Sequence, residues 1–170
     1  MRTRTCLSLL SLCLLAACGG GEDPAPPADT PQAAAFPERF HLAQAPAEVM
    51  DVVALRQDVD PGAQVAVRGK VGALHDRFAT LTLVDLSMKS CDVRPGDSCP
   101  TPWDYCCEDP TTLAERSVQV EFREGDDPLA TSVEGFHGLE LLSQVTVRGH
   151  FEPDDAGNLL LVADGIHVGS

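Results

Sequence analysis

The chain has 170 residues, and its 12 lysines and arginines against 26 aspartates and glutamates give a formal net charge of −14 at pH 7. Nucleic-acid binding draws most of its strength from Lys and Arg on phosphates, so this composition predicts no nucleic-acid partner. The length suffices for a single domain with one core.

The first 18 residues, MRTRTCLSLLSLCLLAAC, have the form of a secretory signal, with Arg2 and Arg4 before an apolar run that ends at Leu15. The run is too short for a membrane-spanning helix. Its end, LAAC at residues 15–18, resembles the lipobox of bacterial lipoproteins. That resemblance implies a signal peptide over residues 1–17, cleavage before Cys18 and acylation of Cys18 with fatty acids such as palmitate. The alternative is an ordinary cleavable signal in which Cys18 has no such role.

The lipobox resemblance also places the mature protein in the bacterial cell envelope, where acylated Cys18 would anchor it to a lipid bilayer, facing the periplasm or the exterior. Removal of Arg2 and Arg4 would take the net charge from −14 to −16. Residues 18–45 are rich in Pro, Ala, Gly and acidic residues and lack periodicity, which predicts a lipidated N-terminus and a flexible tether.

Residues 46–170 form the predicted domain. Its first segment, residues 46–57, has Pro46 at a first helical position, which favours an N-terminal helix, although a strand is the alternative. The apolar stripe of this helix would consist of Val49, Met50, Val53 and Ala54.

Five later segments alternate between apolar and polar residues, as strands do. They span residues 64–74, 78–86, 117–124, 144–153 and 158–168, and residues 127–142 can hold one short helix. This order predicts a mainly β fold, a five-stranded OB-fold-like barrel. Val-x-Val-Arg-Gly occurs at residues 65–69 and 145–149, and a mid-strand glycine lets a small barrel coil sharply. Over residues 50–168 the sequence resembles the anticodon-binding-like OB domains of bacterial proteins; a six- or seven-stranded sandwich is the alternative.

Residues 87–116 are a long insertion between the second and third strands, without predicted secondary structure. It holds the four cysteines that lie outside the signal and the lipobox: Cys91, Cys99, Cys106 and Cys107. An even number of cysteines in an exported domain predicts two disulfides. A bridge between the adjacent Cys106 and Cys107 would close a strained ring, so each should pair with Cys91 or Cys99. Trp103 and Tyr105 would complete a small core around the bridges and offer a candidate interaction surface.

The same cysteines have a functional alternative. Their spacing, C-x7-C-x6-C-C, differs from that of common zinc sites, but four thiolates also suit soft metals such as Cu(I). A redox-active disulfide is a further alternative, although no C-x-x-C is present. The string C-x7-CPTPWDYCC resembles one from a group of uncharacterised bacterial exported lipoproteins with an OB-like body. That resemblance supports the expected fold and compartment, and it brings no known activity.

No catalytic motif emerges from the sequence. The histidines at positions 41, 75, 137, 150 and 167 have no metal-protease spacing, and no phosphate loop or nucleophile elbow is present. We therefore expect no enzyme activity and no cofactor. The sequence predicts a membrane-anchored, extracytoplasmic binding module for an envelope protein, a peptide or a glycan. The alternative function is a metal-handling or thiol-redox protein that uses the four-cysteine loop.

Overall fold

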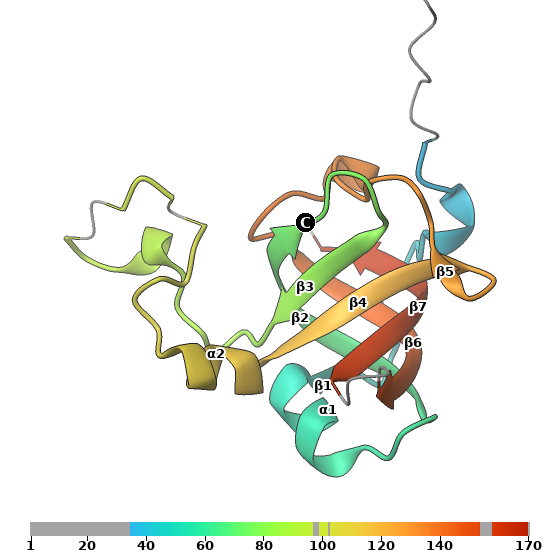
Figure 1. The fold of residues 1–170 in the computed structure, drawn as a ribbon, viewed down its shortest axis with the longest axis horizontal. Helices are drawn as coiled ribbons and strands as arrows, with labels where there is room; N and C mark the ends of the chain where they lie inside the picture. Colours follow the sequence, from blue (N-terminus) through green and yellow to red (C-terminus); the bar gives the residue numbers. More distant parts are fainter. Residues whose placement is uncertain (1–34, 97–98, 102, 154–157, 170) are drawn as a thin grey trace, which may run out of the picture. The chain divides into compact units, whose positions relative to one another are not determined.

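The computed structural model describes residues 35–169 except 97–98, 102 and 154–157. Its five long strands form one barrel (Figure 1), and they are β2 (Gln64–Leu74), β3 (Thr80–Val84), β4 (Ser117–Glu124), β6 (Gln144–Pro153) and β7 (Leu159–Val168). They pair in the order β2-β3-β4-β7-β6, and β6 pairs with β2 to close the barrel. Only β4 and β7 run parallel within this circuit. The predicted five-stranded OB-like barrel is confirmed.

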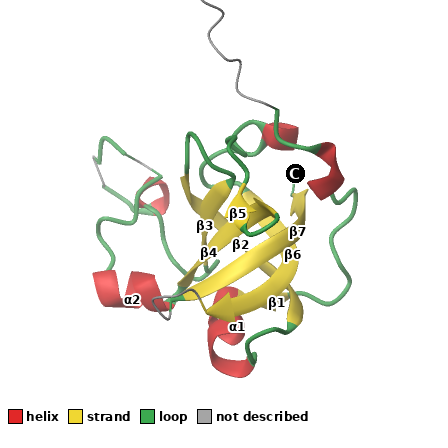
Figure 2. Cartoon of the chain, turned by 45° about the vertical axis from the view of Figure 1, so that its right-hand side comes forward, coloured by secondary structure: helices red, strands yellow, loops and turns green. Residues whose placement is uncertain are grey.

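Short elements attach to this barrel. The two-residue strands β1 (Met50–Asp51) and β5 (Asp127–Pro128) pair with β2 and β4. The helix α1 (Val52–Asp58) lies at one end of the barrel, and the 3-10 helices η1 (Glu38–Phe40) and η3 (Phe136–Gly138) lie at the other (Figure 2). Among the described residues, no helix is long and apolar enough to cross a bilayer.

The two Val-x-Val-Arg-Gly copies lie on neighbouring strands and pair with each other antiparallel. Val65 faces Gly149, Val67 faces Val147, and Gly69 faces Val145. A Cβ atom on Gly149 would lie 2.2 Å from the carbonyl oxygen of Val162, and one on Gly69 would lie 2.6 Å from that of Val84. Both glycines are therefore required by a close backbone approach inside the barrel.

The predicted N-terminal helix is present, but it starts at Val52 and not at Pro46. Met50 and Asp51 pair with β2 instead, and this pairing keeps the preceding residues extended. The buried side chains of α1 are Val52 and Leu55, whereas Val49 of the predicted stripe is 36% exposed.

Part of the segment that we assigned to the tether packs on the barrel. Phe36 and Phe40 are buried, and their rings contact the ring of Phe122 with centroids 5.0 and 5.2 Å away. Phe36 also meets Phe136 in η3 at 4.7 Å. Aromatic burial thus recruits residues 36–40 to the folded domain. The tether before residue 35 and the signal lie outside the described residues.

The short helix predicted within residues 127–142 takes a 3-10 form, η3. Gly135 and Gly138 both adopt φ of 81°, and His137 between them has φ of 48° and ψ of 34°. These left-handed conformations suit glycine and interrupt a regular α-helix, so only one tight turn forms.

Candidate binding groove and cysteine cluster

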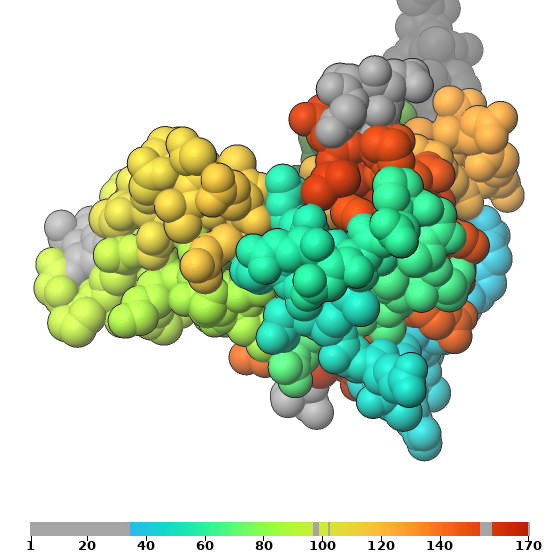
Figure 3. Space-filling view, turned by 90° about the horizontal axis from the view of Figure 1, so that it is seen from below, coloured from blue at the N-terminus to red at the C-terminus, as the bar shows by residue number. Residues whose placement is uncertain are grey.

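The insertion leaves the barrel after β3 and returns at β4, and it forms a lobe at the side of the barrel (Figures 1 and 3). It contains a 3-10 helix, η2 (Cys91–Val93), and a helix, α2 (Pro110–Glu115). Our expectation of an insertion without secondary structure was therefore wrong. Asp109 caps α2 by accepting a hydrogen bond from the backbone N–H of Thr112 at 3.0 Å, and Pro110 occupies the first helical position. This Asp-Pro start is a helix signal that the sequence contained.

Tyr105 fastens the insertion to the barrel. It is 4% exposed and packs with Val84 of β3 and with Met88. A Cβ atom on Gly72 would lie 2.5 Å from Cγ2 of Val84 and 3.5 Å from the Tyr105 ring, so this glycine makes room for the contact. Burial raises the pKa of the Tyr105 hydroxyl above its ordinary value. Trp103, by contrast, is 41% exposed, and its role in an interaction surface stays a prediction.

A groove of about 350 Å³ lies between Tyr105, α2 and the outer face of β2 and β3. Its walls are mainly apolar, and the apolar lining residues are Gly72, Ala73, Val84, Tyr105, Pro110, Leu113 and Ala114. A second hollow of about 220 Å³ shares Ala73 and Thr82 with it and continues to Gln119 on β4. OB-folds bind their ligands on the face of the second and third strands, here β3 and β4, and the groove borders this face at Thr82, Val84 and Ser117.

Few polar groups line the groove. Thr82 donates a hydrogen bond from Oγ1 to Oε1 of Gln119 at 3.3 Å. The other polar lining residues are Ser117 and the exposed Asp104. Asp104 is the charged residue of this lining, and Arg56 donates a hydrogen bond to the carbonyl of the lining residue Ser117 at 2.8 Å. Such a groove favours an apolar group with a positive charge beside it.

Asp85 lies at the end of β3 and has a structural role. It is 5% exposed and accepts hydrogen bonds from the backbone N–H of Ser87 at 2.9 Å, the Ser87 hydroxyl at 2.6 Å and the Val53 N–H at 3.2 Å. Burial alone would raise the pKa of this carboxyl, but the hydrogen bonds outweigh burial and hold the pKa below its ordinary value. Asp85 thus caps α1, whose own N-cap residue Asp51 makes no side-chain cap.

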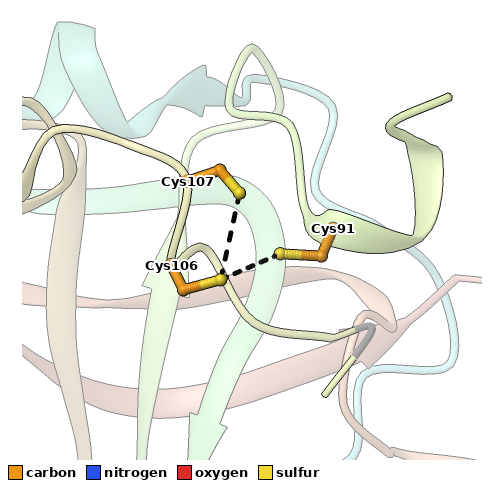
Figure 4. Close-up of side chains that lie close together, drawn as sticks. All are labelled: Cys91, Cys106 and Cys107. Carbon is orange, nitrogen blue, oxygen red and sulfur yellow. Dashed lines mark hydrogen bonds between the residues drawn. The ribbon is translucent and has the colours of Figure 1, made fainter. Parts of the chain in front are cut away.

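The four cysteines of the insertion come together around Cys106. Its sulfur lies 3.5 Å from that of Cys91, 3.6 Å from that of Cys99 and 4.0 Å from that of Cys107 (Figure 4). No disulfide joins any of these four described residues. The four cysteines thus lie close together, and their pairing into two disulfides stays a prediction.

The protein environment supports this cysteine cluster. The backbone N–H of Cys91 donates to the carbonyl of Asp104 at 2.9 Å, and an Arg94–Glu108 ion pair links the two arms of the insertion. Hydrogen bonds to Thr101 lower the pKa of the Cys99 thiol. The hydrogen bonds that Cys106 makes with Cys91 and Cys99 raise the pKa of Cys106 well above its ordinary value.

A second cluster of ligand-type side chains joins η1 to η3. The rings of His41 and His137 stack with centroids 3.7 Å apart, and Nε2 of His137 lies 2.9 Å from a carboxylate oxygen of Glu38. All three side chains are exposed, and their candidate ligand atoms lie within 4.8 Å of one another. Sequence reasoning missed this cluster, because the two histidines are 96 positions apart and no local pattern connects them.

Another histidine, His75, stabilises a loop. Nδ1 of His75 accepts hydrogen bonds from the backbone N–H groups of Arg77 and Phe78, each at 3.2 Å. These hydrogen bonds stabilise the turn between β2 and β3.

The expectation of no enzyme activity stays a prediction.

Comparisons with known proteins agree with the fold. No protein-family model matches the chain, and neither does any curated protein. Solved structures do: an aspartyl-tRNA synthetase from Entamoeba histolytica is similar at 10% identity and TM-score 0.44, over 85% of this chain and 28% of that one. Schizosaccharomyces pombe Pot1pC bound to single-stranded DNA is similar at 13% identity and TM-score 0.40, over 66% and 83%. OBody AM1L10, bound to hen egg-white lysozyme, is similar at 19% identity and TM-score 0.38, over 65% and 81%.

These comparisons correct one expectation from composition. We expected no nucleic-acid partner because of the acidic charge, and that exclusion was wrong, because a barrel of similar fold is solved with single-stranded DNA bound. The likeness itself concerns the fold. The chain spans only about a quarter of the synthetase that it matches.

Proposed function

We propose that the mature protein is a lipid-anchored, extracytoplasmic lipoprotein whose OB-like barrel is a non-catalytic binding module. Its ligand is an apolar peptide segment with basic flanks, presented by a protein of the cell envelope. The signal and the lipobox resemblance at Cys18 support the anchor and the location. The groove between Tyr105, α2 and β2–β3 is the single observation that carries the binding role.

The position and the lining of the groove support this ligand class. It borders the face where OB-folds bind, and it has two formed walls, because Tyr105 is buried against β3 and α2 is capped by Asp109. Its apolar lining suits an aliphatic or aromatic side chain, whereas a glycan would need more hydrogen-bonding groups than Thr82, Asp104 and Ser117 supply. Asp104, the charged residue of the lining, favours a basic residue beside that anchor.

The test uses the full mature chain and fluorescent heptapeptides with a central Leu, flanked either by Lys or by Glu, and a third peptide with Ser in place of Leu. Fluorescence anisotropy should show binding of the Leu–Lys peptide and at least tenfold weaker binding of the other two. Ala73→Trp and Ala114→Trp each fill the groove and should abolish binding. Asp126→Trp carries the same bulk on the exposed β4–β5 turn and should leave binding intact.

Two results would contradict the proposal. Equal binding by the Ala73→Trp, Ala114→Trp and unaltered proteins would place the peptide elsewhere. A labelled single-stranded oligonucleotide is titrated in parallel, and salt-sensitive binding that Ala73→Trp removes would replace the peptide with a nucleic acid as ligand.

A further inference from the structure

We propose that the reduced insertion binds one thiophilic metal ion, Zn²⁺ or Cu⁺, through the sulfurs of Cys91, Cys106 and Cys107, with Cys99 as a fourth ligand. This site is separate from the groove and does not depend on the proposed peptide ligand.

The sulfur positions carry this inference. Thiolates around a metal at a metal–sulfur distance of about 2.3 Å lie about 3.8 Å apart in a tetrahedron and about 4.0 Å apart in a trigonal plane. The three separations from Cys106 are 3.5, 3.6 and 4.0 Å, and the sulfurs of Cys91, Cys106 and Cys107 all lie within 4.8 Å of one another. A disulfide, by contrast, requires a sulfur separation of about 2.05 Å.

The arrangement of the sulfurs around Cys106 favours metal binding over a disulfide. Cys91 and Cys99 lie at almost the same distance from Cys106, so the geometry selects neither as its disulfide partner. A disulfide would satisfy one of these contacts, whereas a metal ion can bind the sulfurs of Cys91, Cys106 and Cys107 together. The adjacent Cys106 and Cys107 both direct their sulfurs into the cluster (Figure 4).

The surroundings fit an ion bound by several thiolates. Cys107 lines an open hollow of about 440 Å³, through which an ion can reach the sulfurs. Lys89 lines the same hollow, and its charge would offset part of the negative charge of a metal held by three or four thiolates. Cys91 is buried, and its backbone N–H is bonded to Asp104, so one ligand is fixed before the ion arrives.

The first experiment measures the metal content and the thiol state of the native protein. The full chain is purified from its native envelope without oxygen, and its metal content and thiols are counted. We expect about one Zn²⁺ or Cu⁺ per chain and four thiols that react with iodoacetamide only after a chelator removes the ion. Two disulfide-linked peptides and no metal would overturn the proposal and confirm the disulfide prediction.

The second experiment assigns the ligands. The reduced, metal-free chain is titrated with Zn²⁺, with Cu⁺ and with Cd²⁺, whose sulfur-to-metal charge-transfer absorption reports thiolate ligands. Competition with Zn²⁺-specific and Cu⁺-specific chelators decides which ion binds tighter. Loss of a supporting outer contact weakens metal binding roughly 10–100-fold, and Cys106→Ser should weaken it by more than this. The variant should also show a weaker charge-transfer band per bound Cd²⁺.

A matched control uses the second cluster of ligand-type residues. His137→Ala disrupts the Glu38–His41–His137 group and should leave thiolate binding unchanged. If metal uptake survives Cys106→Ser and is lost in His137→Ala, the ion binds at the histidines and the proposal is wrong. The thiol-protection measurement on the unaltered protein decides the matter if Cys106→Ser does not fold.

Discussion

Asp85 shows how one side chain connects elements that are distant in sequence. Its carboxylate accepts hydrogen bonds from Ser87 and from Val53, 32 positions away, and so ties the start of the insertion to α1. Asp85→Ala leaves the Val53 N–H without this acceptor in a largely buried site. We expect the free energy of unfolding at pH 7 to fall by about 1–3 kcal/mol. Asp126→Ala, on an exposed turn, should change it by less than about 0.5 kcal/mol.

The pH dependence of this effect follows from the lowered pKa of Asp85. A carboxyl whose pKa is lower in the folded state stabilises the protein above the ordinary value of 3.8, and this stabilisation is lost as the pH falls below that value. Urea unfolding of both proteins between pH 7 and pH 3 should therefore show the difference between them shrinking toward low pH. A difference that stays constant over this range would show that the carboxylate charge has no part in the effect.

The helix α2 forms one wall of the groove, and its stability depends on a single cap. Asp109→Ala removes the acceptor of the Thr112 N–H, a loss of about 0.5–2 kcal/mol for an N-cap. Because α2 lies outside the barrel, we expect faster hydrogen exchange at residues 112–116 and unchanged exchange in β6 and β7. Asp109→Asn keeps a capping oxygen and should behave as the unaltered chain. Faster exchange throughout the barrel would show that α2 and the barrel unfold together.

The elements also show which parts of the structure were predictable from sequence. The long strands match their predicted ranges closely, because alternation of apolar and polar residues is a local pattern, and β4 buries Val118, Val120 and Phe122 as that pattern predicts. The helix predictions were less accurate, because strand pairing at Met50 and the left-handed Gly135 and Gly138 overrode local periodicity.

The candidate sites also differ in how far local sequence patterns could predict them. The cysteines were predictable as a group because they share one loop, whereas their convergence on Cys106 depends on how that loop folds. The groove combines β2, β3 and α2, and the histidine pair joins residues 96 positions apart. No local pattern predicts such contacts.

For the molecule as a whole, the decisive prediction concerns Cys18, which lies outside the described residues. If acyl chains on Cys18 hold the protein in a bilayer, Cys18→Ser should abolish labelling by a fatty-acid analogue and move the protein from the membrane fraction to the soluble one. Cys13→Ser, inside the signal, should leave both results unchanged. Membrane attachment of the Cys18→Ser protein would contradict the anchor and leave the binding groove as a separate question.

The pairing of the two Val-x-Val-Arg-Gly copies also bears on the rate of folding. Val67 and Val147 are 80 positions apart, so barrel closure must restrict a long loop at an entropic cost of about 4 kcal/mol. The backbone N–H of Asp85 donates to the carbonyl of Arg116 at 2.9 Å, and this hydrogen bond joins the two ends of the insertion. If the insertion is already compact when β2 and β6 meet, the flexible loop between them is effectively about 30 residues shorter. The entropic cost of closing the barrel then falls by about 0.4 kcal/mol. The insertion would then let the barrel close about twice as fast as it could with a disordered connection of the same length.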